Sequence, residues 1–157
     1  PGAGAGCRPP LADAEVAVED AERGLVHLHA HRAVLAACSP ALDATLRRSL
    51  AKGAHGGGDA GALAPVQVDP LVCSSADVAL LACRFCYTGE VTECAFRTEA
   101  RLLLQLLRLC ATYQMPPALQ RWAVDAALRC LHEPGGADVA PALLLEAGRF
   151  ALGPEHR

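Results

Sequence analysis

The hydrophobic positions at the start of the chain recur every second residue, which is typical of a half-buried strand. Apolar side chains alternate with charged or small ones from Asp13 to Glu19. The turn sequence Glu-Arg-Gly follows at residues 22–24, and a second alternating run covers residues 25–30. We therefore predict two antiparallel strands joined as a β-hairpin.

After the hairpin the apolar positions recur every three to four residues, which indicates helices. A short helix is expected at residues 33–37. Ser39 and Pro40 predict the start of the next helix, because a serine side chain can accept a hydrogen bond from the first free N–H groups and proline fits the first helical position. This helix should end near Gly53. Its apolar face carries Leu42, Leu46 and Leu50.

The second half of the chain is predicted to be mostly helical. One brief strand at residues 66–68 follows a glycine-rich loop at 53–65. Ser74-Ser75-Ala76-Asp77 resembles a capping box with Asp in place of Glu, and Gly89 suits the end of the helix that starts there. Further helices are expected from about Thr98 to Pro116-Pro117, from Ala118 to Leu131, and after Asp138. Together these elements predict an α+β fold, a three-stranded sheet covered by about five to six helices.

Length and charge narrow the classes of protein. The 157 residues suffice for one ordinary domain, and the 52% of hydrophobic residues argue against disorder. The net charge of −3 excludes an overall basic field for nucleic acid. No apolar run is long enough to span a membrane. Residues 1–11, rich in Gly and Pro and without an initiator Met, predict a flexible segment in a chain cut from a longer protein.

The eight cysteines raise the question of disulfide, zinc or redox chemistry. Several lie on apolar helical stripes, where a free cysteine behaves as a small hydrophobe, so we expect a reducing compartment. Cys83 and Cys86 form a C-x-x-C pair with Cys94 nearby, but a second ligand pair is missing. The pair also falls near a helix C-terminus, where the dipole disfavours a thiolate. We interpret these cysteines as core packing; the alternative is a helical thiol or zinc protein.

His27, His29 and His31 alternate and would share one strand face. A strand spaces them roughly 6.5–7 Å apart along one line, too far for all three to reach one ion at about 2 Å. The sequence also has no phosphate-binding loop, no nucleophile elbow and no obvious nucleophile–base set. We therefore expect no metal, no cofactor and no enzymatic activity.

Several short strings, taken in order, resemble the BTB/POZ domain. The segment from Asp13 to Val18 looks like the opening strand of that family. Residues 28–40, LHAHRAVLAACSP, are similar to its signature of Ala-His-Arg/Lys, Val-Leu and Ser-Pro. Residues 66–69 resemble its third strand, and residues 85–91, FCYTGEV, its aromatic-x-Tyr-Thr-Gly segment. Residues 103–115 resemble the leucine-rich helix that follows.

The resemblance covers about residues 12–132, and residues 133–157 look like the start of a BACK-like helical extension. It implies an interaction module that is not an enzyme. We expect a cytoplasmic or nuclear substrate adaptor of a cullin-RING ubiquitin ligase, with a cullin scaffold as partner and the protein substrate held outside this chain. The alternative is an oligomerisation or corepressor-binding domain of a transcriptional regulator. Dimeric members carry a helix before the first strand, and residues 1–11 cannot form such a helix. Whether this chain forms a homodimer therefore stays an open question.

The resemblance also implies contact residues. Asp13 and Arg32 are expected to lie together as a buried or half-buried charge pair, which lines a pocket at the dimer surface in transcription-factor members. Cullin-binding members carry an apolar-x-Glu motif on the helix after Ser-Pro or in the segment behind it. Here that segment reads Leu50-Ala51-Lys52-Gly53, with Lys in place of Glu or no Glu position at all.

On the helix that begins at Pro40, we expect Leu46 and Leu50 to face inward and Arg47 to face outward with Arg48 and Lys52. Tyr87 and Tyr113 are the other surface candidates that the resemblance suggests. These positions complete the set of candidate protein-contact residues.

Overall fold

The computed structural model of the chain describes residues 11–55, 66–91, 99–131 and 140–151. In chain order the elements are β1 (Ala14–Asp20), β2 (Gly24–Ala30), α1 (Arg32–Cys38), α2 (Pro40–His55), β3 (Val66–Gln67), α3 (Ala76–Thr88), α4 (Ala100–Thr112), α5 (Pro117–Cys130) and α6 (Ala140–Ala151). The predicted α+β class is confirmed, with three strands and six helices in this part of the chain. None of these described helices is long and apolar enough to cross a membrane.

The sheet is mixed, and β1 is its middle strand. β2 pairs with β1 in antiparallel register, as the hairpin prediction required, with Ala14 opposite Ala30. β3 pairs with β1 in parallel, with Val16 opposite Val66. A parallel pair needs a crossover between its strands, and here α1 and α2 provide it.

Alternate residues of β1 point into the core, as the sequence pattern predicts, but one residue of the opposite face is buried as well. Val16 and Val18 face the core and are 4% and 0% exposed. Ala17 points to the other face, yet it is also fully buried. Its register partners are His27 on β2 and Gln67 on β3, and these longer side chains flank its single methyl group.

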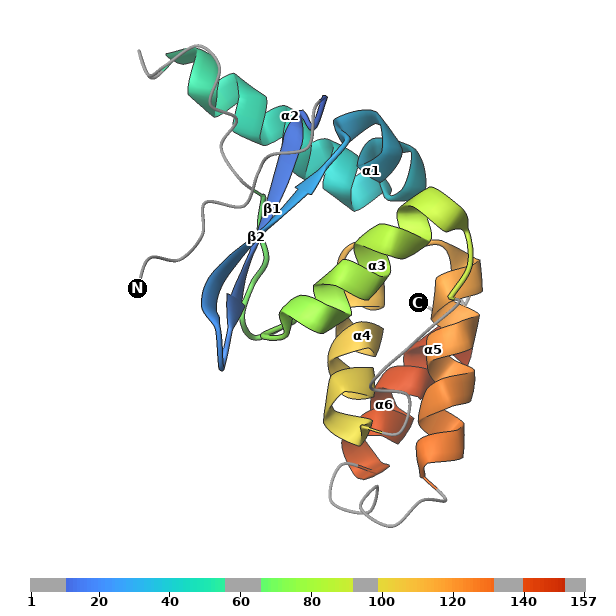
Figure 1. The fold of residues 1–157 in the computed structure, drawn as a ribbon. Helices are drawn as coiled ribbons and strands as arrows, with labels where there is room; N and C mark the ends of the chain where they lie inside the picture. The colour runs from blue at the N-terminus through green and yellow to red at the C-terminus, as the bar shows by residue number, and fades with distance from the viewer. Residues whose placement is uncertain (1–10, 56–65, 92–98, 132–139, 152–157) are drawn as a thin grey trace.

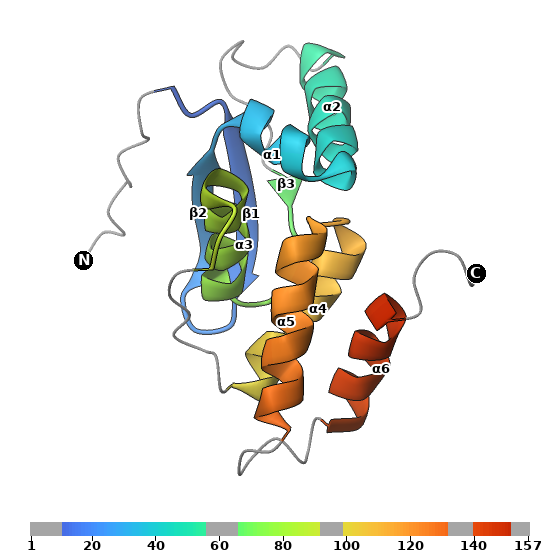
Figure 2. The same ribbon diagram turned by 90° about the vertical axis from the view of Figure 1, so that its right-hand side faces the viewer.

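Helix α3 is the element that joins the sheet to the helical half of the molecule. It contacts β1, β2 and α1, and it also packs against α4. Figures 1 and 2 show the hairpin on one side of α3 and the group of α4, α5 and α6 on the other, with α1 and α2 together at one end. The core therefore runs through both layers without a break.

The most amphipathic helix, α4, supplies the centre of the helical half. Leu103, Leu106, Leu107 and Cys110 follow the spacing i, i+3, i+4 and i+7, and each is 0% exposed. The three-to-four-residue spacing in the sequence predicts these four as part of an apolar stripe. Of the two further residues that it assigns to the stripe, Leu102 is half-buried and Ala111 is exposed. Neighbouring helices α5 and α6 pack on α4 and on each other.

The helix boundaries fall close to the predicted ones. α2 continues to His55, two residues beyond Gly53, because a glycine in the last turn weakens a helix without stopping it. α3 ends where predicted, at Gly89, whose φ of 72° is the left-handed conformation that glycine adopts without strain. Thr98, Asp138 and the loop 56–65 lie outside the described residues.

The start of α2 is capped as predicted. The Ser39 side-chain oxygen accepts a hydrogen bond from the Leu42 N–H at 3.0 Å. The same hydroxyl donates to the backbone carbonyl of Tyr113, at the end of α4. Since Ser39 is 0% exposed, both bonds form away from water, and the bond to Tyr113 joins α2 to the helical half.

The predicted capping box at Ser74–Asp77 is wrong. Ser75 occupies the N-cap position of α3, and its side chain makes no capping hydrogen bond. Asp77 instead forms a bidentate ion pair with Arg23, with both N–O distances at 3.0 Å. The cap comes from Asp20, whose carboxylate accepts the Ala76 N–H at 2.8 Å across 56 positions of sequence.

Asp20 also closes the hairpin turn. Its other carboxylate oxygen accepts the N–H groups of Glu22 and Arg23 at 3.0 and 2.9 Å. Three backbone donors therefore converge on one carboxylate that is only 9% exposed. These hydrogen bonds, with that from Ala76 the largest cause, hold the pKa of Asp20 below its ordinary value of 3.8.

Replacing Asp20 should test this link. Asp20→Asn removes the charge and one acceptor, so we expect the free energy of unfolding at neutral pH to fall by about 1–3 kcal/mol. A carboxylate whose pKa is lowered by folding stabilises the protein above pH 3.8 and loses that contribution as the pH falls further. The difference between wild type and variant in urea unfolding should therefore shrink below about pH 4. An equal difference at every pH would contradict the carboxylate's role.

The two N-cap serines provide a matched pair of variants. Ser39→Ala removes a cap and leaves the Tyr113 carbonyl without its donor, so we expect a loss of about 2–3 kcal/mol of stability. Ser75→Ala removes no capping bond and should cost about 0.5 kcal/mol or less. Thermal and urea unfolding of both variants measure the difference. Equal losses of stability in the two variants would show that the hydrogen bonds of the Ser39 side chain do not stabilise the fold.

Candidate functional site

Asp13 and Arg32 lie next to each other, but they do not form the expected buried charge pair. The Asp13 carboxylate accepts the backbone N–H of Arg32 at 2.7 Å. It therefore caps the first turn of α1, while Asp13 itself is exposed and Arg32 half-buried. A carboxylate at a helix N-terminus satisfies a free N–H and the helix dipole together, which needs no guanidinium.

Tyr87 is an exposed surface residue, as expected, with 47% of its area accessible. Its hydroxyl accepts the backbone N–H of His31 at 2.6 Å and lies 2.9 Å from Nδ1 of the same residue. The two rings meet edge to face with centroids 5.8 Å apart. Tyr87 therefore fastens the C-terminal end of α3 to the start of α1 while its ring stays open to solvent.

The histidines do not act as one group. His31 follows the end of β2 and serves as the N-cap residue of α1. His27 and His29 remain on the strand and share Glu15 on β1, at 2.5 and 3.8 Å from its two carboxylate oxygens. Among the described residues no group of three histidine, cysteine or acidic side chains has the geometry to hold a metal ion.

The candidate helix α2 separates its residues into an inner and an outer face. Leu46 is 5% exposed and packs in the core, so it contributes to the fold rather than to an open surface. Arg47 points outward and pairs with Asp43 one turn earlier, with an N–O distance of 2.9 Å. Arg48 is also exposed, and its contacts run to a backbone oxygen and a hydroxyl of its own helix. The side chains of Leu50 and Lys52 lie outside the described part of the structure.

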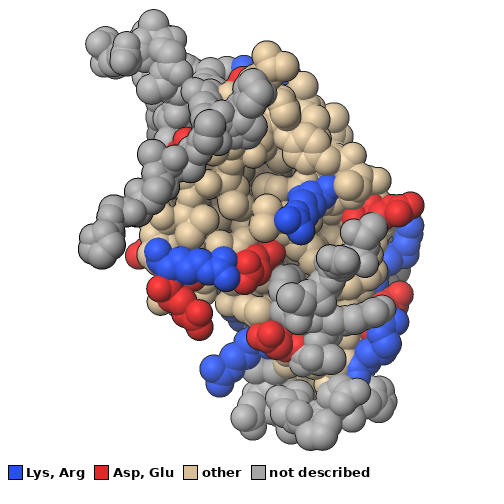
Figure 3. Space-filling model, in the orientation of Figure 1, with Lys and Arg blue, Asp and Glu red and all other residues tan. Residues whose placement is uncertain are grey.

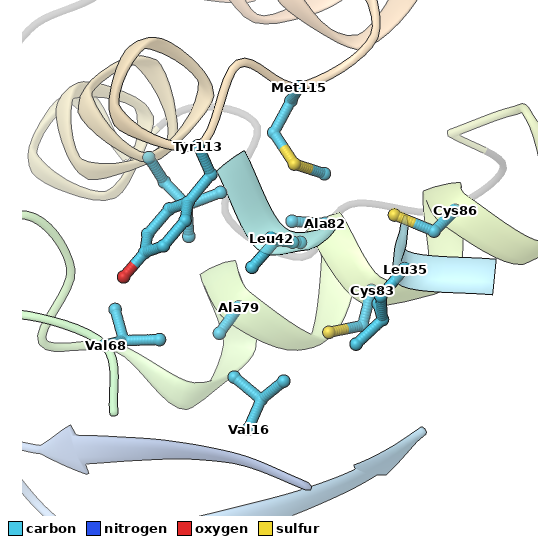
Figure 4. A pocket seen from close by; sticks show the side chains of 11 residues that line it. Val16, Leu35, Leu42, Val68, Ala79, Ala82, Cys83, Cys86, Tyr113 and Met115 are labelled. Atoms are coloured by element: carbon cyan, nitrogen blue, oxygen red, sulfur yellow. The ribbon is translucent and has the colours of Figure 1, made fainter. Parts of the chain in front are cut away.

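Tyr113 lies in the wall of a pocket rather than on the outer surface. The pocket has a volume of about 350 Å³, counted with the space open to solvent. Figure 4 shows Tyr113 and Met115 at the top of the view, Leu42 of α2 below them, and Ala79 and Cys83 of α3 lower still. Burial raises the pKa of the Tyr113 hydroxyl, and a backbone hydrogen bond to Asp69 opposes this effect.

Sequence reasoning did not find this pocket. Its lining comes from β1, α1, α2, α3 and α4 and from segments beside them, so no stretch of sequence carries a signal for it. Its lining side chains are apolar or sulfur-containing apart from the Tyr113 hydroxyl. The arrangement suits an apolar side chain and offers little to a charged ligand.

The cysteines fit the interpretation as core packing. Cys83 and Cys86 lie in the second half of α3 and line the pocket. Burial raises the pKa of Cys83 to about 11 and that of Cys110 to about 12. Since a neutral thiol is neither a strong nucleophile nor a metal ligand, these groups are poorly suited to catalysis or zinc binding. Cys94 lies outside the described residues.

The described surface shows no strong charge of one sign. On the face drawn in Figure 3, basic and acidic side chains alternate over the described residues. The large hydrophobic residues that are exposed are scattered along the described chain, apart from one adjacent pair in α6: Leu11, Leu25, Leu71, Tyr87, Leu128, and the pair Leu144 and Leu145. Scattered exposed apolar residues are ordinary on a protein surface, and mixed charges on the described face are unlike a nucleic-acid interface.

The comparisons with known proteins agree with this geometry. The family model of the BTB/POZ domain matches residues 7–124, which is well over half of the chain. A search of curated proteins gave no match. BTB domains are non-catalytic modules for protein–protein interaction and dimerisation. The strand order and the helices described above are consistent with that fold, and the chain belongs to the BTB/POZ domain family.

Proposed function

We propose that this BTB/POZ domain is the scaffold-binding part of a substrate adaptor in a cullin-RING ubiquitin ligase. The domain itself performs no chemistry. It docks on the cullin while a region outside this chain holds the substrate, so the substrate reaches a high effective concentration at the ligase.

The exposed outer face of α2 is the observation that carries the proposal. In cullin-binding members of the family this helix and the segment after it contact the cullin. Here α2 extends away from the body of the domain, so its outer face is open to a partner (Figures 1 and 2). Its apolar residues Leu42 and Leu46 are committed to the core, while Arg47 and Arg48 are exposed.

The pocket lies on the inner side of α2. Leu42, which lines it with Tyr113 and Met115, is buried in the core. A partner on the outer face of α2 therefore does not reach the pocket, and the proposal rests on the outer face alone. The exposed charges of that face would set the specificity of the contact.

The proposed contact differs from the family motif at one position. Where the motif has an apolar residue, any residue and Glu, this chain has Leu50-Ala51-Lys52. A lysine reverses the charge that the family presents there. We therefore expect cullin binding weaker than that of members with the complete motif.

The alternative is an oligomerising or corepressor-binding domain of a transcriptional regulator. One observation favours it: Leu11, three residues before the start of β1, is 87% exposed. In dimeric members the segment before the first strand packs on the partner chain. A leucine exposed at that place would be covered in such a dimer.

We also propose that α6 begins a BACK-like extension that is fixed to the BTB domain. Leu143 and Ala147 of α6 are buried, and Glu146 lies 3.7 Å from the Arg108 guanidinium of α4. Its other side exposes Leu144 and Leu145. In this proposal the BTB domain ends near residue 132 and the extension starts at 133, and the packing of α6 on α4 and α5 supports a fixed connection between the two.

Light scattering on a sizing column tests the adaptor proposal against its alternative. The chain is run alone and then mixed with a cullin N-terminal domain at micromolar concentration. We expect a co-eluting complex whose mass gives the stoichiometry. A stable homodimer without any cullin complex would contradict the adaptor role and support the alternative.

A charge reversal at the motif position gives a sharper test. Lys52→Glu restores the apolar-x-Glu pattern, so we expect its Kd for the cullin domain to fall roughly tenfold, equivalent to about 1.4 kcal/mol. Arg121→Glu makes the same change of charge on the exposed surface of α5 and serves as the matched control. Calorimetry measures both variants and wild type. If both substitutions lowered the Kd equally, the gain in affinity would come from the overall change of charge. That result would contradict α2 as the docking site.

A further inference from the structure

The junction between α1 and α2 brings two cysteines together from distant parts of the sequence. Cys38 is the last residue of α1, and Cys86 lies in the second half of α3. The Cys38 thiol donates to the Cys86 backbone oxygen, with Sγ and O 3.4 Å apart. Cys38 is half-buried, whereas Cys86 is 9% exposed and lines the pocket.

The two thiols also interact side chain to side chain. Burial is the main cause that raises the pKa of Cys86, and the neighbouring Cys38 is the next. A side-chain hydrogen bond with Cys38 is a further, smaller cause, which agrees with the contact between the Cys38 thiol and the Cys86 backbone. No function described above uses this contact.

Three of the other four described cysteines are buried. Cys110 and Cys130 are 0% and 2% exposed, so a dissolved oxidant does not reach them in the folded protein. Cys73 is also fully buried, and its thiol donates to the Ser75 carbonyl. Cys83 is half-buried as well and lines the pocket beside Cys86. Cys38 differs from it because its thiol reaches Cys86 from another helix and is hydrogen-bonded to that residue.

We propose that Cys38 and Cys86 form a redox-modifiable pair that a hydroperoxide converts to a disulfide. In the first step the Cys38 sulfur attacks the terminal peroxide oxygen. An S–O bond forms, the O–O bond breaks, and an alcohol or water leaves with the proton. In the second step the Cys86 sulfur attacks the Cys38 sulfur, the S–O bond breaks, and water leaves. Two thiols are oxidised by two electrons in total, and one peroxide is reduced.

The disulfide would act on the elements around the pocket. It would join α1 to α3 at residues 48 positions apart in sequence. A crosslink over such a loop restricts the unfolded chain and raises stability. It would also draw the Cys86 sulfur from the pocket wall toward α1 and fix the start of α2, which follows Cys38 after one residue. The disulfide would form whichever partner the domain binds.

Mass spectrometry after oxidation tests the pair. The reduced chain is treated with hydrogen peroxide, the remaining thiols are alkylated, and the intact mass and peptide map are recorded. We expect a loss of about 2 Da, two fewer alkylated thiols, and one crosslinked peptide that contains Cys38 and Cys86. The oxidised form should also melt at a higher temperature than the reduced form, and a reductant should reverse both changes.

Two variants make the test specific. Cys38→Ala changes a half-buried residue and should abolish the crosslink, while Cys130→Ala, in α5, should leave it unchanged. The wild-type peptide map alone decides the outcome if either variant folds poorly. The proposal is overturned if wild type gains oxygen at Cys38 without a crosslink, if the crosslink joins other cysteines, or if it persists in Cys38→Ala.

Discussion

The carboxylate of Asp20 is the interaction on which the arrangement of the two layers depends. It stands at the end of the central strand and accepts hydrogen bonds from the hairpin turn and from the first N–H of α3. One side chain therefore sets the turn between β1 and β2 and the position at which α3 leaves the sheet. Since α3 contacts the sheet, α1 and α4, this placement governs how both halves meet.

A second constraint lies at the other end of α3, where α1 ends and α2 begins. Ser39 caps α2 and donates to the end of α4, and the Cys38 thiol donates to the backbone of α3. Tyr87 holds the start of α1 in the same region. The pocket lies between the elements that these hydrogen bonds bring together, so its shape follows from backbone anchoring more than from any side chain in its wall.

The chemistry of this surface favours recognition. The pocket is lined by aliphatic, sulfur-containing and aromatic groups, and the pKa values of its thiols are raised by burial. No arrangement of this kind activates a nucleophile or stabilises a developing charge. A module that binds other proteins needs what is present here: a rigid helix with an exposed outer face, an apolar cavity beside it, and charges of both signs around it.

The sequence by itself determined the elements of the fold and the family. Period-two and period-four patterns located the hairpin and the helices, Ser39-Pro40 located the start of α2, and Gly89 the end of α3, because these signals act within a few residues. The family resemblance came from several short sequence segments that occur in the order expected for the BTB/POZ domain. Candidate contact residues came from the same strings, and Tyr87 proved to be exposed.

Only the tertiary structure decided the contacts between residues far apart in the chain. Local reasoning assigned the cap of α3 to Ser74–Asp77, whereas Asp20 provides it from 56 residues away. The family resemblance paired Asp13 with Arg32 as charges, whereas the Asp13 carboxylate accepts the backbone N–H of Arg32. The pocket and the Cys38–Cys86 contact have no sequence signal at all. In each case a group contacts the partner that tertiary packing places nearest to it. Because packing depends on the whole chain, a short stretch of sequence does not show that partner.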